Sequence, residues 1–171
     1  EDVLNIVRSK FKIVDTEFES SNSDAIDIDF SKGFLNNVNI INSLGDGIDF
    51  SGSNVVGSNI KIFNSKDKAI SIGESSKLKL NNVYIEKAFV GLANKDGSNA
   101  NIDGITIKDA LYPIGVFKKK PEYGNSYTIL NNYKNLSSSN KYQISNGSFL
   151  EINGKYIKPN KTNKEIINIL Y

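Results

Sequence analysis

The sequence contains no cysteine, histidine, methionine or tryptophan among its 171 residues, and only three prolines. Without cysteine, the chain has neither a disulfide framework nor a thiolate metal site. Without histidine, it lacks the usual general base, the Ser-His-Asp triad and the commonest transition-metal ligand. No apolar run reaches the length needed to cross a membrane, so no membrane span is predicted.

Charge is divided unevenly along the chain, although the net charge is only +2. Residues 1–113 carry 16 acidic and 12 basic side chains, whereas residues 114–171 carry 3 acidic and 9 basic ones. Neither part is extreme enough to predict a nucleic-acid partner. The chain starts at Glu1 without a methionine or a signal-type stretch, which predicts a mature secreted or cell-surface protein, or a piece of a longer one.

A short phrase recurs along the chain, first as Asp24-Ala25-Ile26-Asp27-Ile28 and next as Asp46-Gly47-Ile48-Asp49-Phe50. Later copies start at Lys68, Val90 and Ile114, so the starts lie 22, 22, 22 and 24 residues apart. A fixed period of this length is the signature of stacked structural repeats. The sequence also holds 24 asparagines and 13 glycines, which suit short strands joined by sharp corners.

A second series of apolar residues keeps the same period, and each member is followed two residues later by another apolar residue. This alternation is typical of short strands. The first members are Thr16, Val38, Ile60, Val83 and Ile105. Asn37, Asn59 and Asn82 directly precede three of them, which predicts a ladder of asparagine side chains at one corner.

The predicted fold is therefore all-β: a right-handed parallel β-helix with coils of about 22 residues and three short strands per coil. The coils are expected over residues 1–120, and residues 121–171 are expected to cap the same domain. The cap would hold a hairpin at Asn153-Gly154 and a short terminal helix with Thr162 as N-cap. A leucine-rich repeat is excluded because the periodic leucines and helical segments are missing. The expected inward core row is Ile26, Ile48, Ile70, Leu92 and Val116.

Acidic residues stack on the outward side of the repeated strands, since Asp24 is in register with Asp46 and Asp27 with Asp49. Stacked carboxylates repel unless a cation, a proton or a basic neighbour intervenes. Three interpretations remain open: a solvated acidic face, a calcium site, or a catalytic pair. The calcium ligands would be Asp27, Asp29 and Asp49. The catalytic set would be Asp24, Asp46, Asp49, Glu74 and Lys95.

Lys95 admits two interpretations of its own. It is expected either to form a surface ion pair with Glu74 or to act as the base of a lyase, with the acidic row neutralising a uronate through Ca²⁺.

The order of these motifs resembles that of the pectin-lyase-like superfamily over about residues 2–120, and within it the polygalacturonase-type hydrolases. Those enzymes carry an Asp, a paired Asp, a Gly-His-Gly and an Arg-x-Lys on successive coils. Here Asp24 matches the first place and Gly45-Asp46 the second, with one acid missing. Lys68 stands in the place of the His, and Ala93-Asn94-Lys95 keeps the Lys without the Arg.

A closer resemblance is to bacterial β-helix modules that are joined to spore-coat-kinase-like or lamin-tail-like domains. It is carried by residues 45–53, 68–76, 95–98 and 119–124, and by the ending at Tyr171. The resemblance implies the fold, a surface setting and more chain before the N-terminus.

Three functions follow as hypotheses. The first is an extracellular or cell-surface module that presents a strand face to carbohydrate or to other subunits, with no cofactor required. The second is a polysaccharide lyase or glycoside hydrolase acting on a uronate-containing polymer, with Ca²⁺ as an optional cofactor. The third is a structural subunit that stacks end to end through its first coil into filaments, because an uncovered β-helix end offers unpaired strand edges.

Overall fold

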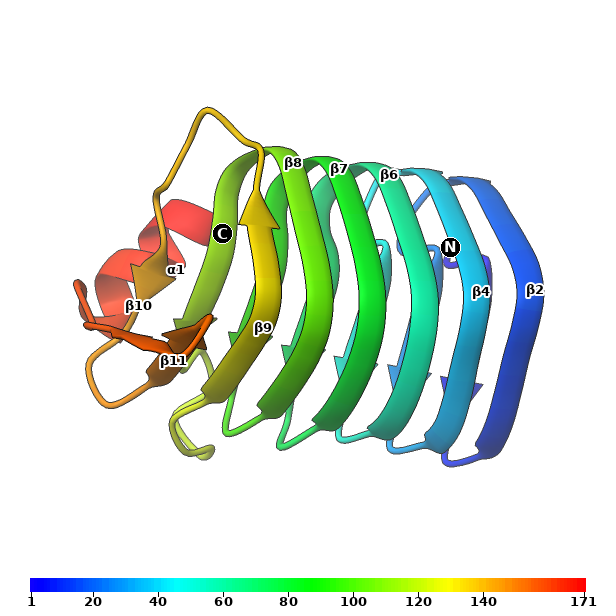
Figure 1. The fold of residues 1–171 in the computed structure, drawn as a ribbon. Coiled ribbons are helices and arrows are strands. Elements are labelled where there is room, and N and C mark those ends of the chain that lie inside the picture. The colour runs from blue at the N-terminus through cyan, green and yellow to red at the C-terminus, as the bar shows by residue number, and fades with distance from the viewer.

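A computed structural model describes residues 1–171 and shows a parallel β-helix whose coils stack along one axis (Figure 1). The predicted fold class is confirmed. No helix in the structure has both the length and the apolar character needed to cross a membrane. The elements are β1 (Leu4–Val7), β2 (Lys10–Ser21), β3 (Ile26–Asp29), β4 (Lys32–Ser43), β5 (Ile48–Ser51), β6 (Asn54–Gly73), β7 (Lys77–Lys95), β8 (Asn99–Phe117), β9 (Tyr127–Asn135), β10 (Gln143–Ile144), β11 (Phe149–Ile152), β12 (Lys155–Ile157) and α1 (Asn163–Leu170).

Each coil presents three faces. The first face holds β1, β3 and β5 together with the last residues of β6, β7 and β8. The second face holds residues 10–14, 32–36, 54–58, 77–81, 99–103 and 127–131, which pair in parallel. The third face follows it and begins with Thr16 in the first coil and Val38 in the second. The coil-to-coil register reproduces the period expected from the sequence.

The core is a set of apolar rows that run along the axis. On the first face, Ile48 pairs with Ile70 and Ile70 with Leu92, and all three are fully buried. The next member of this row is Ile114, because Leu92 pairs with Ile114. The expectation that Val116 belongs to it is wrong. The sixth coil begins at Tyr112, which pairs with Val90, so successive coils still start 22 residues apart. The predicted start at Ile114 is therefore two residues too late.

The strands are longer than expected because the corners do not interrupt pairing. Between the second and third faces, one residue per coil takes a left-handed backbone and the ladder resumes beyond it. Three of these residues are asparagines of the predicted ladder, with φ of 52° at Asn37, 55° at Asn59 and 55° at Asn82. Asparagine accepts this conformation more readily than most residues. The amide Nδ2 of Asn82 donates to Oδ1 of Asn59 at 2.7 Å, and that of Asn37 donates to Oδ1 of Asp15 at 2.7 Å. Between them the predicted ladder is wrong, because the Nδ2 of Asn59 donates to Oδ1 of Asn36 at 3.1 Å instead of to Asn37.

The corner between the first and second faces is held by a buried serine column that the sequence analysis did not single out. The Oγ of Ser53 accepts the backbone N–H of Ser31 at 2.9 Å, and the Oγ of Ser76 accepts that of Ser53 at 2.9 Å. The same contact joins Ser76 to Ser98 at 3.1 Å. This column satisfies buried backbone donors at the corner, which every stable fold requires.

The C-terminal segment contains the predicted hairpin and the predicted helix. Strands β11 and β12 pair antiparallel around Asn153-Gly154, and β11 also extends the sheet beside β9. Helix α1 has a complete capping box between Thr162 and Glu165. Its buried Ile166 and Leu170 pack on the outward side of the first face, against Val90, Ala93 and Phe117. The helix therefore closes one end of the first face (Figure 1).

At the opposite end, β1 pairs only with β3 and β2 only with β4. These strands present edges of the kind that motivated the filament hypothesis. End-to-end stacking stays a prediction.

Candidate functional site

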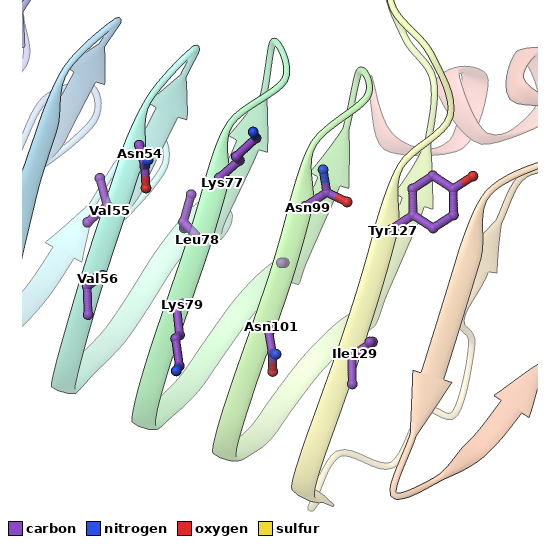
Figure 2. A pocket seen from close by; sticks show the side chains of 11 residues that line it. Asn54, Val55, Val56, Lys77, Leu78, Lys79, Asn99, Asn101, Tyr127 and Ile129 are labelled. Atoms are coloured by element: carbon purple, nitrogen blue, oxygen red, sulfur yellow. The ribbon is translucent and has the colours of Figure 1, made fainter.

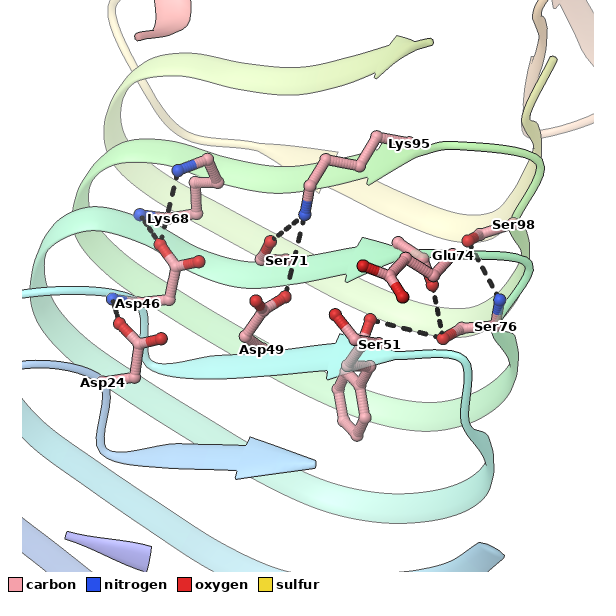
Figure 3. A network of polar contacts seen from close by, with 12 residues as sticks. Asp24, Asp46, Asp49, Ser51, Lys68, Ser71, Glu74, Ser76, Lys95 and Ser98 are labelled. Atoms are coloured by element: carbon pink, nitrogen blue, oxygen red, sulfur yellow. Dashed lines mark hydrogen bonds and ion pairs between the residues drawn. The ribbon is translucent and has the colours of Figure 1, made fainter. Parts of the chain in front are cut away.

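A cavity of about 280 Å³ lies on the first face, where β5, β6 and β7 run side by side (Figure 3), and Tyr171 at the end of α1 also lines it. It is called the first-face cavity below. All five residues of the predicted catalytic set line it, although they come from four coils. The lining is Asp24, Asp46, Asp49, Ser51, Asp67, Lys68, Ser71, Gly73, Glu74, Lys95, Asp96, Lys119, Lys120 and Tyr171.

Asp24 and Asp46 have a structural role at the entrance to the strands. Asp24 Oδ1 accepts the backbone N–H of Asp46 at 2.6 Å, and Asp46 Oδ1 accepts that of Lys68 at 2.9 Å. The column starts at Asp2, which accepts the N–H of Asp24 at 3.2 Å. Each carboxylate therefore satisfies a backbone donor of the next coil. This contact explains why an acid recurs at this place without invoking a reaction.

Lys68 ends the acidic column by replacing an acid with a cation. Its side chain is buried, with Nζ 3.5 Å from Asp46 Oδ1 and 2.5 Å from Asp67 Oδ2. Burial raises the pKa of Asp46 to about 7, and the charge of Lys68 opposes that rise. At the place of the histidine in the polygalacturonase-type pattern, the structure thus has an ammonium held between two carboxylates.

Asp49 and Lys95 form the centre of the cavity. Lys95 Nζ lies 3.7 Å from Asp49 Oδ1 and donates to Ser71 Oγ at 2.6 Å (Figure 3). Lys95 is buried at the end of β7, and Ser71 is buried on β6. Asp49 Oδ1 is buried and accepts no hydrogen bond. An unsatisfied carboxylate oxygen of this kind is uncommon, since most buried polar atoms have a partner.

Glu74 belongs to the opposite wall of the cavity, where its partner is Lys120 instead of the expected Lys95. The hydroxyl of Tyr123 also donates to Glu74 at 3.4 Å. The loop that carries Lys120 is anchored by Asp96, whose Oδ1 accepts the backbone N–H groups of Lys119 and Lys120, each at 2.7 Å. The interpretation of Lys95 and Glu74 as an ion pair is wrong, because Lys95 turns toward Asp49.

Lys119 brings a further positive charge to the cavity without a carboxylate partner. Its Nζ lies 3.7 Å from the centroid of the Tyr171 ring, and the Nζ of Lys68 lies 4.5 Å from the same centroid. Both distances suit a cation–π contact. Partial burial, and then the charges of Lys95 and Lys68, lower the pKa of Lys119. The three ammonium groups are therefore close enough to influence one another.

The predicted calcium ligands do not coincide with the acidic cluster of the structure. One carboxylate oxygen from each of Asp24, Asp46 and Asp49 lies within 4.8 Å of the others, whereas Asp27 and Asp29 are outside this group. Burial and neighbouring acids raise the pKa of Asp27 to about 7. Lys68 and Lys95 already lie beside two of the clustered carboxylates. Calcium binding stays a prediction.

Lys119, Lys120 and Tyr171 line the cavity, although the sequence alone did not predict them there. The basic run at residues 118–120 was visible, but its position over the first face depends on the Asp96 contacts. Tyr171 reaches the cavity only because α1 folds back onto β8. Asp67 and Ser71 could have been found from the repeat, since both lie in the coil that carries Lys68.

No family model matches the chain, and a search of the curated proteins finds no match. The β-solenoid fold is therefore established from the structure, while membership of the pectin-lyase-like superfamily stays a prediction.

Proposed function

We propose that this β-solenoid binds carbohydrate in the first-face cavity and acts as a secreted or cell-surface module. The observation that carries the proposal is the Asp49 and Lys95 pair, 3.7 Å apart, with Asp49 Oδ1 buried and without a donor. A sugar hydroxyl both donates and accepts, so one hydroxyl would donate to Asp49 while accepting from Lys95. A carboxylate on the sugar would be attracted by Lys119, which has no acidic partner.

Substituting Asp49 with asparagine is expected to weaken saccharide binding about tenfold, since a charge-assisted hydrogen bond becomes a neutral one. The measurement is calorimetric titration with galacturonate oligomers and with the matching neutral galactose oligomers. Stronger binding of the galacturonate series would place the uronate carboxylate beside Lys119, and Lys119→Gln should then remove the difference.

The matched control is Asp109→Asn, which removes an exposed acid at a corner away from the cavity. It should bind as the wild-type protein does. Failure of the wild-type protein to bind any saccharide of either series would overturn the proposal. So would equal affinities for the wild-type protein and Asp49→Asn.

A second candidate function is cleavage of a glycosidic bond, favoured by the raised pKa of Asp46. A carboxyl with a pKa of about 7 is protonated over much of the neutral range, as a general acid must be. One oxygen each of Asp24, Asp46 and Asp49 lies within 4.8 Å of the others, so a second carboxyl group is close to Asp46. In this role Asp46 would protonate the leaving oxygen and Asp49 would serve as the second carboxylate.

We expect polygalacturonate or alginate to yield new reducing ends, at a rate that declines as the pH rises through about 7 and Asp46 loses its proton. Unsaturated products, followed by their ultraviolet absorbance, would instead indicate a lyase with Lys95 as the base. Each assay is run with Ca²⁺ and with chelator. Absence of both product types would exclude cleavage and leave the binding proposal intact.

A further inference from the structure

The second face carries a groove that the first-face cavity does not touch. A hollow of about 410 Å³ extends over β6 to β9 and includes Lys77, Lys79, Asn99 and Tyr127 (Figure 2). A neighbouring hollow of about 610 Å³ continues it toward Phe34, and the two share Val56, Lys79 and Asn101. Together they form one groove across the strands, along the axis of the solenoid.

The groove lies on a strongly positive part of the molecule. The segments 10–14, 32–36, 54–58 and 77–81 contain no acidic residue, and the next segment, 99–103, contains one, Asp103. They contain five exposed lysines, and none of these makes an ion pair. The five are Lys10, Lys12, Lys32, Lys77 and Lys79.

Two pairs of these lysines are also neighbours. Lys10 pairs in register with Lys32, and Lys77 and Lys79 point outward from the same strand. Like charges on adjacent strands repel. The groove itself is lined by Lys77 and Lys79 and by one carboxylate, that of Asp103. Neither lysine makes an ion pair, so an anionic ligand would be attracted by the excess positive charge.

Aromatic rings extend the groove at its C-terminal end. Tyr127 stacks on Phe149 with centroids 6.1 Å apart, and Phe149 stacks on Tyr156 at 5.4 Å. Tyr127 and Tyr156 are each 52% exposed, so both rings offer a free apolar surface. Such surface favours contact with an amphipathic ligand, because one part of the ring is apolar and the hydroxyl is polar.

From these features we propose that the second face binds an acidic polysaccharide, with its chain lying along the groove. The lysines would neutralise spaced anionic groups, and Asn54, Asn99 and Asn101 would bond hydroxyls. Tyr127 would pack against the face of a sugar ring. Arginine is the residue best suited to bidentate phosphate contacts, and none lies on this face. That absence favours a polysaccharide over a nucleic acid.

This site is separate from the first-face cavity and does not depend on the function proposed there. The first face has the aspartate column, whereas the second face has uncompensated lysines. The two sites share no lining residue, so they can be tested with different variants.

The test compares the wild-type protein with the double variant Lys77→Gln/Lys79→Gln in affinity electrophoresis through gels containing alginate, heparin or neutral dextran. The wild-type protein should be retarded by alginate or heparin and not by dextran. The double variant should lose about tenfold in affinity, because two charges facing the polymer are removed. The carboxylated and the sulfated polymer together show which anionic group is preferred. Tyr127→Ala should also weaken binding.

The control is Lys61→Gln/Lys66→Gln, which removes the same charge from two exposed lysines of β6 that lie beyond its second-face segment. It should bind as the wild-type protein does. An equal loss in this control would reduce the effect to net charge and overturn the proposal. The proposal would also be refuted by no retardation in either acidic polymer, by unchanged binding in Lys77→Gln/Lys79→Gln, or by tighter binding to single-stranded DNA.

Discussion

Replacing Ile70 with alanine is expected to lower the free energy of unfolding by about 2–5 kcal/mol. Ile70 is fully buried on the first face, between Ile48 of the preceding coil and Leu92 of the following one. The backbone ladders hold the three strands at a fixed spacing, so the neighbouring coils cannot move in to fill the space left by the side chain. The loss is measured by urea unfolding followed by circular dichroism.

Leu111→Ala is the matched control, because Leu111 has the same number of carbon atoms as Ile70 and is 48% exposed. Its substitution should change the free energy of unfolding by about 0.5 kcal/mol or less. Equal losses in the two variants would contradict the role assigned to the apolar rows. A reduced slope of the unfolding curve for Ile70→Ala would instead indicate coils that unfold separately.

The free energy of unfolding is also expected to fall as the pH rises from about 4 to about 7. The pKa of Asp46 is raised from 3.8 to about 7 in the folded protein. Across this interval the folded state holds a proton that the unfolded state has lost, so raising the pH favours unfolding. The stabilisation is complete below the unfolded pKa and is lost as the pH reaches the folded one. For a group as buried as Asp46, the contribution is up to about 4 kcal/mol.

Asp46→Asn should remove most of this dependence and make the protein more stable than the wild type at pH 8. The asparagine stays neutral, and its Oδ1 can still accept the backbone N–H that Lys68 donates to Asp46 at 2.9 Å. Some dependence will remain, because burial also raises the pKa of Asp27.

Urea unfolding of the wild-type protein, Asp46→Asn and the control Asp109→Asn at several pH values gives the three curves. If the curve of Asp46→Asn runs parallel to that of the wild-type protein, Asp46 is ionised throughout the interval and the assignment is wrong.

The Ile70 and Asp46 predictions depend on the apolar rows and on the first-face cavity. The sequence predicted the rows more completely than the cavity. The apolar rows were readable because each inward position sees the same environment in every coil, so isoleucine, valine and leucine recur at one spacing. The sequence likewise predicted the Asn59–Asn82 contact at one corner and Thr162 as the N-cap of the terminal helix. It did not predict that Asn59 would bond Asn36 instead of Asn37. Val116 was predicted in this row in place of Ile114 because the last repeat lacks the polar residues that mark the start of earlier copies.

The sequence predicted only part of the first-face cavity. Asp24, Asp46, Asp49, Glu74 and Lys95 were found because they follow the repeat, and the structure gathers them in one cavity. Their pairing was not readable, since the side chain of Lys95 can reach carboxylates on more than one coil. Lys95 pairs with Asp49 and not with Glu74, because Glu74 already forms an ion pair with Lys120 from a loop outside the repeat.

By itself, the sequence determined the stacked parallel coils, their period and the side of each strand that faces inward, because these follow from a local alternation repeated at a constant interval. The tertiary structure alone decided which charges meet. It brings Lys119 and Tyr171 over the first face, and it places Lys77 and Lys79 beside Tyr127 in one groove on the second. Periodicity specifies backbone neighbours, whereas long side chains and non-repeating loops select their partners only after the coils have stacked.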